Sequence, residues 1–171
     1  MVIPILYPTA IPFPPIADLL IATATTSVTI NGLDGKAHGG YDFEIYFRND
    51  TATATAYAMY ANNDTTATNY TRQELRARGV DIAIGGSTTD AFLIGTPLEP
   101  GNTYKATGSI GISSDGRLIS THMFGLMAVQ QLNLCTWSKN TVVTDLTSII
   151  ITSSIANGIG VNSRFRLWRK I

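Results

Sequence analysis

The sequence is short of charge, and this shortage excludes a class of function. Charged residues make up 14% of the 171, and 12 Lys and Arg balance 12 Asp and Glu. Globular chains average about 25% charged residues. Because there is no basic excess, binding to nucleic acid through phosphate contacts is not expected. The polar surface must instead be built mainly from uncharged residues such as Thr, Ser, Asn and Gly.

The chain also lacks paired cysteines and long apolar runs. A single cysteine, Cys135, excludes a disulfide within the chain. Its apolar neighbourhood is typical of a buried thiol that packs as a small hydrophobic side chain. No apolar run approaches the ~20 residues that a membrane-spanning helix needs. The N-terminus has no cationic region of the kind that begins a secretory signal. We therefore expect neither a membrane partner nor secretion.

Catalytic signatures are lacking as well. His38 and His122 are the only histidines, no G-x-S-x-G elbow occurs, and the spacing of His and Cys matches no zinc site. Asp42 and Glu44 would lie about 7 Å apart on one strand face, a separation found in inverting glycoside hydrolases. That alternation is more typical of a solvated outer face. From these patterns we expect no enzymatic activity, no metal and no cofactor.

One loop carries several oxygen ligands. Asn62, Asn63, Asp64 and Asn69 lie close together in the sequence. Calcium takes about six to eight oxygen ligands, so a cation site is one interpretation. Asn and Asp are also the residues that turns select for backbone reasons. Turn formation is the interpretation that we favour.

Proline is plentiful, but only at one end. Five of the seven prolines fall within the first fifteen residues. Each fixes its own φ, removes a backbone donor and disfavours helix in the preceding residue, so the segment is extended. It is too apolar for a free tail. We predict an arm over residues 1–16 that lies against its own domain, a neighbouring subunit or a larger assembly. The predicted assembly residues are Ile3, Pro4, Ile5, Leu6, Tyr7, Pro8, Ile11, Pro12, Phe13, Pro14 and Pro15.

Residues 17–171 predict one all-β domain. Residues 41–47 alternate between apolar and polar side chains, the pattern of a half-buried strand. Residues 69–78 combine helix-favouring residues with alternation, and we favour an exposed strand. Further strands are expected over residues 19–30, 53–60, 80–84, 91–94, 104–112, 118–126, 132–137, 146–155 and 163–170. Short strands separated by turn signals predict a jelly-roll-like antiparallel β-sandwich, although other β-sandwich topologies fit the pattern too.

Aromatic residues offer a candidate glycan site. Tyr60, Tyr70 and Trp137 lie near Asn and Asp residues, a combination that suits stacking against sugars. Aromatic side chains also dominate the packing of cores and interfaces, which is the interpretation that we favour.

Two stretches carry a resemblance to a known family. Residues 60–71 read YANNDTTATNYT, with Asn-Asp followed by Asn-Tyr-Thr. Residues 146–168 close on a Gly-x-Gly-x-x-Ser bend before a last strand. Gly158 and Gly160 would permit that bend by adopting positive φ. Together the two stretches resemble small β-rich virion proteins of tailed bacteriophages, of the capsid-decoration or tail-fibre type.

The resemblance implies a structural role in a virion assembled in the host cytoplasm. It implies a capsid-decoration (cement) subunit that docks as a homotrimer on the major capsid protein or another virion protein. The arm would then reach a neighbouring subunit or the shell. The alternative is a carbohydrate-binding or receptor-binding module of a tail fibre, with a glycan as its ligand.

Overall fold

The predicted all-β sandwich is confirmed by the computed structural model, which describes residues 14–78, 80–87, 98–126 and 131–170. The strands are β1 (Ala17–Leu20), β2 (Ser27–Asn31), β3 (Tyr41–Arg48), β4 (Tyr57–Ala61), β5 (Tyr70–Arg78), β6 (Asp81–Ser87), β7 (Thr103–Ile112), β8 (Arg117–Leu126), β9 (Gln131–Val142), β10 (Ser148–Ser153) and β11 (Arg164–Arg169). Two short helices, α1 (Gly35–His38) and η1 (Ala67–Asn69), lie in connections. No helix in these ranges is both long and apolar enough to cross a membrane.

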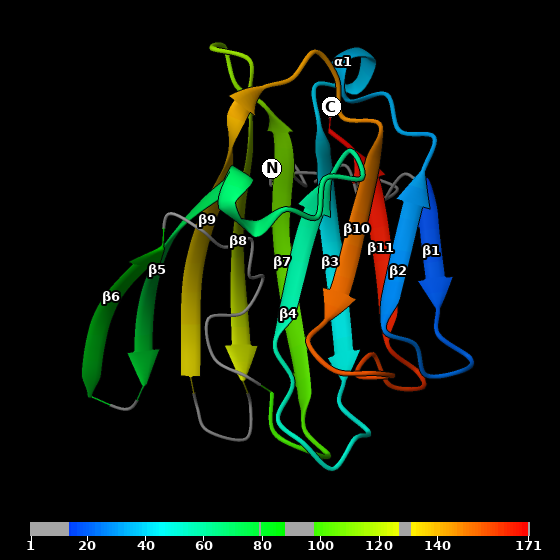
Figure 1. Ribbon diagram of the computed structural model, residues 1–171, viewed down its shortest axis with the longest axis vertical. Coiled ribbons are helices and arrows are strands. Elements are labelled where there is room, and N and C mark those ends of the chain that lie inside the picture. Colours follow the sequence, from blue (N-terminus) through cyan, green and yellow to red (C-terminus); the bar gives the residue numbers. More distant parts are fainter. Residues whose placement is uncertain (1–13, 79, 88–97, 127–130, 171) are drawn as a thin grey trace, which may run out of the picture.

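The strands form two antiparallel sheets of unequal width. The large sheet has eight strands in the order β1-β11-β3-β7-β8-β9-β5-β6, and the small sheet has three in the order β2-β10-β4. The small sheet lies over only one side of the large sheet (Figure 1). We call β1, β11, β3 and β7 the covered half, and β8, β9, β5 and β6 the overhanging half. The arrangement is a jelly-roll-like sandwich.

The main core fills the space between the small sheet and the covered half. The alternation predicted over residues 41–47 is confirmed, because Phe43, Ile45 and Phe47 are buried on the inner face of β3. Phe47 stacks on Tyr57 of β4 with ring centroids 4.0 Å apart. Met59 lies on the same strand of the small sheet and is also buried. Burying these large side chains is the main stabilising contribution of this half.

The strand expected over residues 19–30 is two strands in different sheets. β1 pairs with β11 in the large sheet, whereas β2 pairs with β10 in the small one. Between them, the Ile21 N–H donates to the Ser163 carbonyl, and Thr25 exchanges two hydrogen bonds with Ile159. These contacts satisfy backbone groups while the chain crosses from one sheet to the other.

The other predicted strands differ from the observed strands mainly in the residues at which they begin and end. The strand expected over residues 69–78 is β5, which begins at Tyr70 and is paired with β9 on one side and β6 on the other. Its helix-favouring residues are overridden by these two ladders, since tertiary context outweighs intrinsic propensity. The strand expected over residues 53–60 begins only at Tyr57. The strand expected over residues 91–94 lies outside the described residues.

Most of the predicted arm, residues 1–13, lies outside the described residues. Pro14 is exposed and Pro15 is half-buried. The Ile16 N–H donates to the Leu167 carbonyl at 2.7 Å. Ile16, which was assigned to the arm, is therefore already hydrogen-bonded to the sheet, one residue before the boundary predicted at residue 17.

Candidate functional site

The outer face of the large sheet, which points away from the small sheet, changes from charged to apolar side chains across its width. Residues that lie directly opposite one another on successive strands form rows across this face. One row begins with charged residues on β1, β11 and β3 and ends with apolar residues on β9, β5 and β6. Its members include Asp18, Arg166, Glu44, Thr107, Leu134, Leu75 and Ile84.

The charged end of the outer face is held by ion pairs within the chain. Arg164 donates two hydrogen bonds to Asp18 at 2.7 and 2.6 Å. Glu44 accepts from Lys105 at 2.7 Å and from Arg166 at 3.1 Å. These donors lower the pKa of Asp18, mainly through Arg164, and that of Glu44, mainly through Lys105. The charges at this end are largely matched internally.

The other end carries an exposed apolar surface, which we call the outer apolar patch. Five large apolar side chains on three adjoining strands are each at least 45% exposed. They are Leu75, Ile82, Ile84, Leu132 and Leu134. A groove of about 630 Å³ crosses this surface and is lined in part by Gln73, Leu75, Ile84 and Leu134. Contiguous exposed apolar surface of this kind marks interaction sites on soluble proteins.

Strand β6 borders this patch and has one neighbour, β5, among the described strands. No other described strand pairs with its second edge. Natural edge strands are usually kept short or protected by Lys, Pro or a bulge. β6 has seven residues, contains neither Lys nor Pro, and pairs with β5 in unbroken register. The patch and this open edge together form the strongest candidate site in the described part of the chain.

The inner face of the overhanging half carries a row of ionisable groups. His122, Cys135 and Glu74 lie opposite one another on β8, β9 and β5. The Glu74 side chain is 1% exposed, and its Oε2 lies 2.6 Å from Arg72 Nη1 and 3.6 Å from Arg76 Nη2. Two guanidinium groups thus compensate a buried carboxylate, which would otherwise be costly to bury. Within the described ranges, no group of three or more His, Cys, Asp or Glu side chains is arranged to hold a metal.

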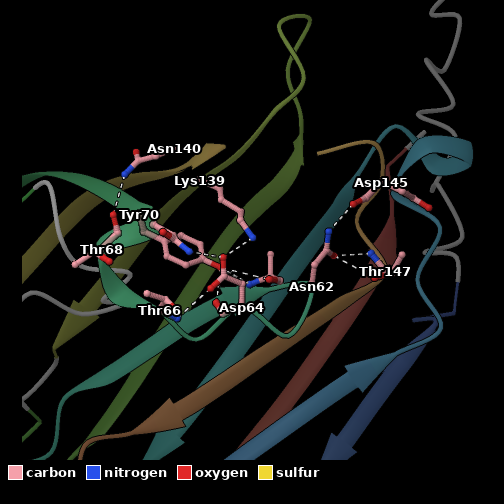
Figure 2. A network of polar contacts seen from close by, with 11 residues as sticks. Asn62, Asp64, Thr66, Thr68, Tyr70, Lys139, Asn140, Asp145 and Thr147 are labelled. Atoms are coloured by element: carbon pink, nitrogen blue, oxygen red, sulfur yellow. Dashed lines mark hydrogen bonds and ion pairs between the residues drawn. The ribbon is translucent and has the colours of Figure 1, made fainter. Parts of the chain in front are cut away.

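The loop considered as a calcium site is a braced turn, which we call the Asp64 turn (residues 60–71; Figure 2). Asn62 and Asn63 have φ of 55° and 58°, a region that Asn tolerates better than most residues. Asp64 Oδ2 accepts from Lys139 Nζ at 2.7 Å and from Asn69 Nδ2 at 2.8 Å. Its Oδ1 accepts from the Thr66 N–H. The carboxylate is therefore occupied by donors of its own chain, as the turn interpretation predicts.

The electrostatics of this turn favour the ionised carboxylate. Burial alone would raise the pKa of Asp64, but hydrogen bonds from Lys139, Asn69 and the Thr66 backbone lower it to about 2. The Lys139 side chain is only 8% exposed. The ion pair thus joins β9, in the overhanging half, to the connection that follows β4.

The same turn also bonds to β4 and to the segment before β10. The Tyr70 hydroxyl donates to the Asp64 carbonyl at 2.7 Å and accepts from the Ala61 N–H at 3.1 Å. Asn62 donates to the Asp145 carbonyl and accepts from the Thr147 N–H, as Figure 2 shows. Residues 60–71 therefore have a structural role, since they tie β4, β5 and β9 to the segment before β10.

The aromatic residues proposed for glycan contact are not an exposed platform. Tyr70 and Trp137 are 0% exposed and meet edge to face, with centroids 5.3 Å apart. Tyr60 is half-buried and packs edge to face against Tyr70. This corrects the expectation that all three could stack on a sugar, because the rings of Tyr70 and Trp137 are enclosed by protein. They form an aromatic cluster between β4, β5 and β9.

The remaining candidate residues lie apart from one another. His38 Nδ1 lies 2.9 Å from the Tyr41 hydroxyl at the end of α1, whereas His122 is buried on β8. Cys135 is buried, as expected. Asp42 and Glu44 share the outer face of β3, as the alternation predicts. The structure does not bring either histidine to these carboxylates, which point away from the side of the sheet where His122 is buried.

Gly158 and Gly160, in the bend near the C-terminus, do not have the positive φ values that were predicted for them. The positive φ values belong to Asn157 and Asn162, at 57° and 67°, and not to Gly158 or Gly160. A Cβ on Gly158 would lie 2.8 Å from Ser153 Cβ, and one on Gly160 would lie 2.6 Å from the Arg48 carbonyl oxygen. The glycines are therefore required by close packing, and asparagines take the left-handed positions.

No family model and no curated protein matches the sequence. Solved structures with a similar course of the chain include alginate lyase Aly36B (TM-score 0.36, 9% identity, covering 90% of this chain and 81% of that one). They also include the marine PL-14 alginate lyase from Aplysia kurodai (TM-score 0.34, 8% identity, 87% and 72%). A third is Scytalido-glutamic peptidase (TM-score 0.28, 13% identity, 85% and 72%).

These structures correct one expectation. We expect no enzymatic activity on the ground that local catalytic motifs are lacking, but the similar solved structures are alginate lyases and a peptidase. The expectation is corrected to this extent: the lack of a local motif does not exclude activity, because function resides in a site and not in a short sequence motif. Identities of 8–13% and TM-scores below 0.5 assign no substrate or reaction to this chain.

Proposed function

We propose that this chain is a structural subunit of a phage virion that is held in its assembly by the overhanging half of the large sheet. The observation that carries the proposal is the outer apolar patch beside the open edge of β6. Exposed side chains such as Ile82, at 75%, and Ile84, at 86%, leave much apolar surface in water unless a partner covers it.

The phage assignment is supported by the two stretches that resemble virion proteins of the decoration or tail-fibre type. The partner would be another virion protein, such as the major capsid protein, or further copies of this chain. The homotrimer and the reach of the arm are parts of the same proposal. A chain that begins at Ala17 tests the arm, because it should dock more weakly while keeping its fold.

The test is docking onto particles of the phage that encodes the chain, prepared without this subunit. Purified protein should sediment with the particles, and Ile84→Lys should remain in the supernatant because it places a charge in the patch. Thr121→Lys is the matched control, since Thr121 is exposed on the outer face of β8, outside the patch. Failure of the wild-type protein to sediment would reject the virion role.

A second candidate function, action on an acidic polysaccharide, is favoured by the ionisable row on the inner face. His122 and Glu74 supply groups that can exchange protons, and Arg76, which lies 3.6 Å from Glu74, supplies a cation that can pair with a uronate carboxylate. Arg76 is the most exposed of the residues in the Glu74 ion pairs, at 38%.

This second function is tested by mixing the protein with polyuronates and following the ultraviolet absorbance of unsaturated products. The wild type and Thr121→Ala should be equally active, and Glu74→Gln should be inactive while keeping its circular dichroism spectrum. The absence of turnover with every polyuronate would reject this candidate. The tail-fibre alternative, a glycan-binding module, predicts saturable binding without turnover in the same samples.

A further inference from the structure

Three side chains of complementary reactivity meet in the Asp64 turn. Lys139 carries an amine, Asn69 carries a carboxamide, and the Asp64 carboxylate lies between them. Asp64 Oδ2 accepts from Lys139 Nζ at 2.7 Å (Figure 2) and from Asn69 Nδ2 at 2.8 Å. We infer that this turn is a self-modification site, at which Lys139 and Asn69 slowly join through an isopeptide bond. The inference goes beyond the proposed assembly function and does not depend on it.

The bond would form by the exchange of one amide for another. Lys139 gives a proton to the Asp64 carboxylate, and the neutral Nζ then attacks Cγ of Asn69. The tetrahedral intermediate collapses when the bond between Cγ and Nδ2 breaks. Asp64 relays protons from Nζ to the leaving nitrogen. Two protons leave Nζ in all, so the products are the new amide and one ammonium ion, and neither an oxidant nor a reductant is needed.

The position of Asp64 suits this relay. One carboxylate oxygen contacts both nitrogens, so it also holds Nζ and Nδ2 no farther apart than the sum of its two hydrogen-bond lengths. Lys139 is directly opposite Tyr70 on the neighbouring strand, and Asn69 precedes Tyr70 at the end of η1. The β5–β9 ladder therefore fixes both reacting residues. For attack, Nζ must come within about 3–3.5 Å of Cγ.

The site is largely shielded from water. The Lys139 side chain is 8% exposed and the Asp64 side chain is 20% exposed. Tyr70 is fully buried, and Lys139 Nζ lies 5.8 Å from the centroid of its ring. A dry site limits competing hydrolysis, and enclosure holds the three groups in one arrangement.

A second Lys–carboxylate pair provides a contrast. Lys105 Nζ lies 2.7 Å from Glu44 Oε2, but the Lys105 side chain is 60% exposed. In the described part of the chain, the other side chain bonded to Glu44 is the guanidinium of Arg166. This pair has an amine and a carboxylate but no carboxamide to attack, so no bond is expected there.

The reaction should be slow. Burial raises the pKa of Asp64, but hydrogen bonds from Lys139 and Asn69 lower it to about 2. Asp64 is therefore a weak base, and the neutral amine forms only briefly. One turnover for each chain is nevertheless sufficient. The freshly folded chain should hold the ion pair, and the stored chain should hold the covalent bond.

The bond would strengthen the junction between the two halves of the large sheet. It would join β9 to the connection that follows β4, and these segments are distant in the sequence. Long-range cross-links stabilise a fold mainly by restricting the unfolded chain. The midpoint of urea unfolding should therefore rise as the stored protein matures.

Intact mass spectrometry of the full chain tests the inference. The mass should fall during storage by that of one ammonia. Tryptic digestion should then release a branched peptide that joins Asn69 to Lys139. Cyclisation of an asparagine onto the following peptide nitrogen also releases ammonia, and Asn31-Gly32 is a sequence that favours it. The branched peptide is therefore the deciding signal.

Matched variants separate the three roles. Lys139→Arg keeps a cation beside Asp64 but supplies no nucleophile, and Asn69→Ala removes the carbonyl carbon that is attacked, so neither should give the branched peptide. Asp64→Ser can still accept from the Thr66 N–H but cannot relay protons, and it should slow the reaction by at least about a hundredfold. Lys105→Arg should react at the wild-type rate. Circular dichroism checks that each variant is folded.

Three outcomes would overturn the inference. The first is a folded wild-type chain that gives no branched peptide after prolonged storage. The second is a branched peptide that joins Lys139 to Asp64 with the loss of one water, because the electrophile would then be the carboxylate. The third is an unchanged rate in Asp64→Ser, which would show that the carboxylate does not relay protons.

Discussion

The covered half and the outer apolar patch of the overhanging half place apolar side chains on opposite faces of the large sheet, although Tyr70 and Trp137 in the overhanging half still point inward. On β3, in the covered half, Phe43 points inward and is buried, whereas Asp42 points outward. On β5, in the overhanging half, Glu74 points inward and is buried, whereas Leu75 points outward and is 45% exposed. Both strands alternate between apolar and polar side chains. On β3 the apolar side chain faces the small sheet, whereas at this point of β5 the charged side chain does.

This reversal shows where each half finds its cover. The apolar face of the covered half is closed by the small sheet of the same chain. The outer apolar patch on β9, β5 and β6 points away from that sheet, and the small sheet does not cover it. A strand that breaks the inward-apolar rule within an otherwise regular sheet is therefore an indication of an interface.

The largest expected effect comes from the covered core. Phe47→Ala should lower the free energy of unfolding by about 3–5 kcal/mol, because it removes a fully buried ring that stacks on Tyr57. Ile84→Ala, in the outer apolar patch, should change it by less than about 0.5 kcal/mol in the monomer. Urea unfolding of both variants measures the difference. Equal effects would contradict the assignment of Ile84 to an interface instead of the core.

The next largest effect comes from the ion pair that joins the two halves. Lys139→Met should cost about 2–3 kcal/mol, since it leaves the Asp64 carboxylate partly buried without its cation. Amide hydrogen exchange should quicken most in β5 and β9. Exchange that quickens equally in β3 and β11 would show that Lys139 supports the whole fold and not this junction.

Acid should weaken the same junction. The folded-state pKa of Asp64 is about 2, below its ordinary value of 3.8, so its contribution is present above the ordinary value and is lost as pH falls through about 2. The size is about 2 kcal/mol, at roughly 1.4 kcal/mol per pKa unit. Urea unfolding between about pH 5 and pH 2 should show this loss in the wild type, and Asp64→Asn should lack it. An equally steep loss in Asp64→Asn would place the acid sensitivity elsewhere.

The smallest effect is expected at the charged end of the outer face. Lys105→Ala breaks the 2.7 Å contact with Glu44, but the Lys105 side chain is 60% exposed. Exposed ion pairs contribute less than about 1 kcal/mol, and Arg166 remains as a second partner of Glu44. A loss above about 2 kcal/mol in urea unfolding would contradict the view that this end is simply a solvated face.

The all-β class, the alternation of β3 and the strand that became β5 were all predictable from the sequence. These follow from local chemistry, because a period of two fixes which side chains share a face. The turn role of the Asn-rich loop was also predictable, since Asn tolerates positive φ and Asp accepts nearby backbone donors.

Which face of each strand is covered could not be predicted from the sequence. Alternation cannot show that Leu75 points outward, that Tyr70 and Trp137 are enclosed, or that residues 19–30 divide between two sheets. Each of these depends on pairings between strands distant in the sequence, such as β5 with β9 and β1 with β11. A one-residue change in phase exchanges the two faces of a strand, so the position of the second layer, and not the local pattern, determines which residues become core and which become interface.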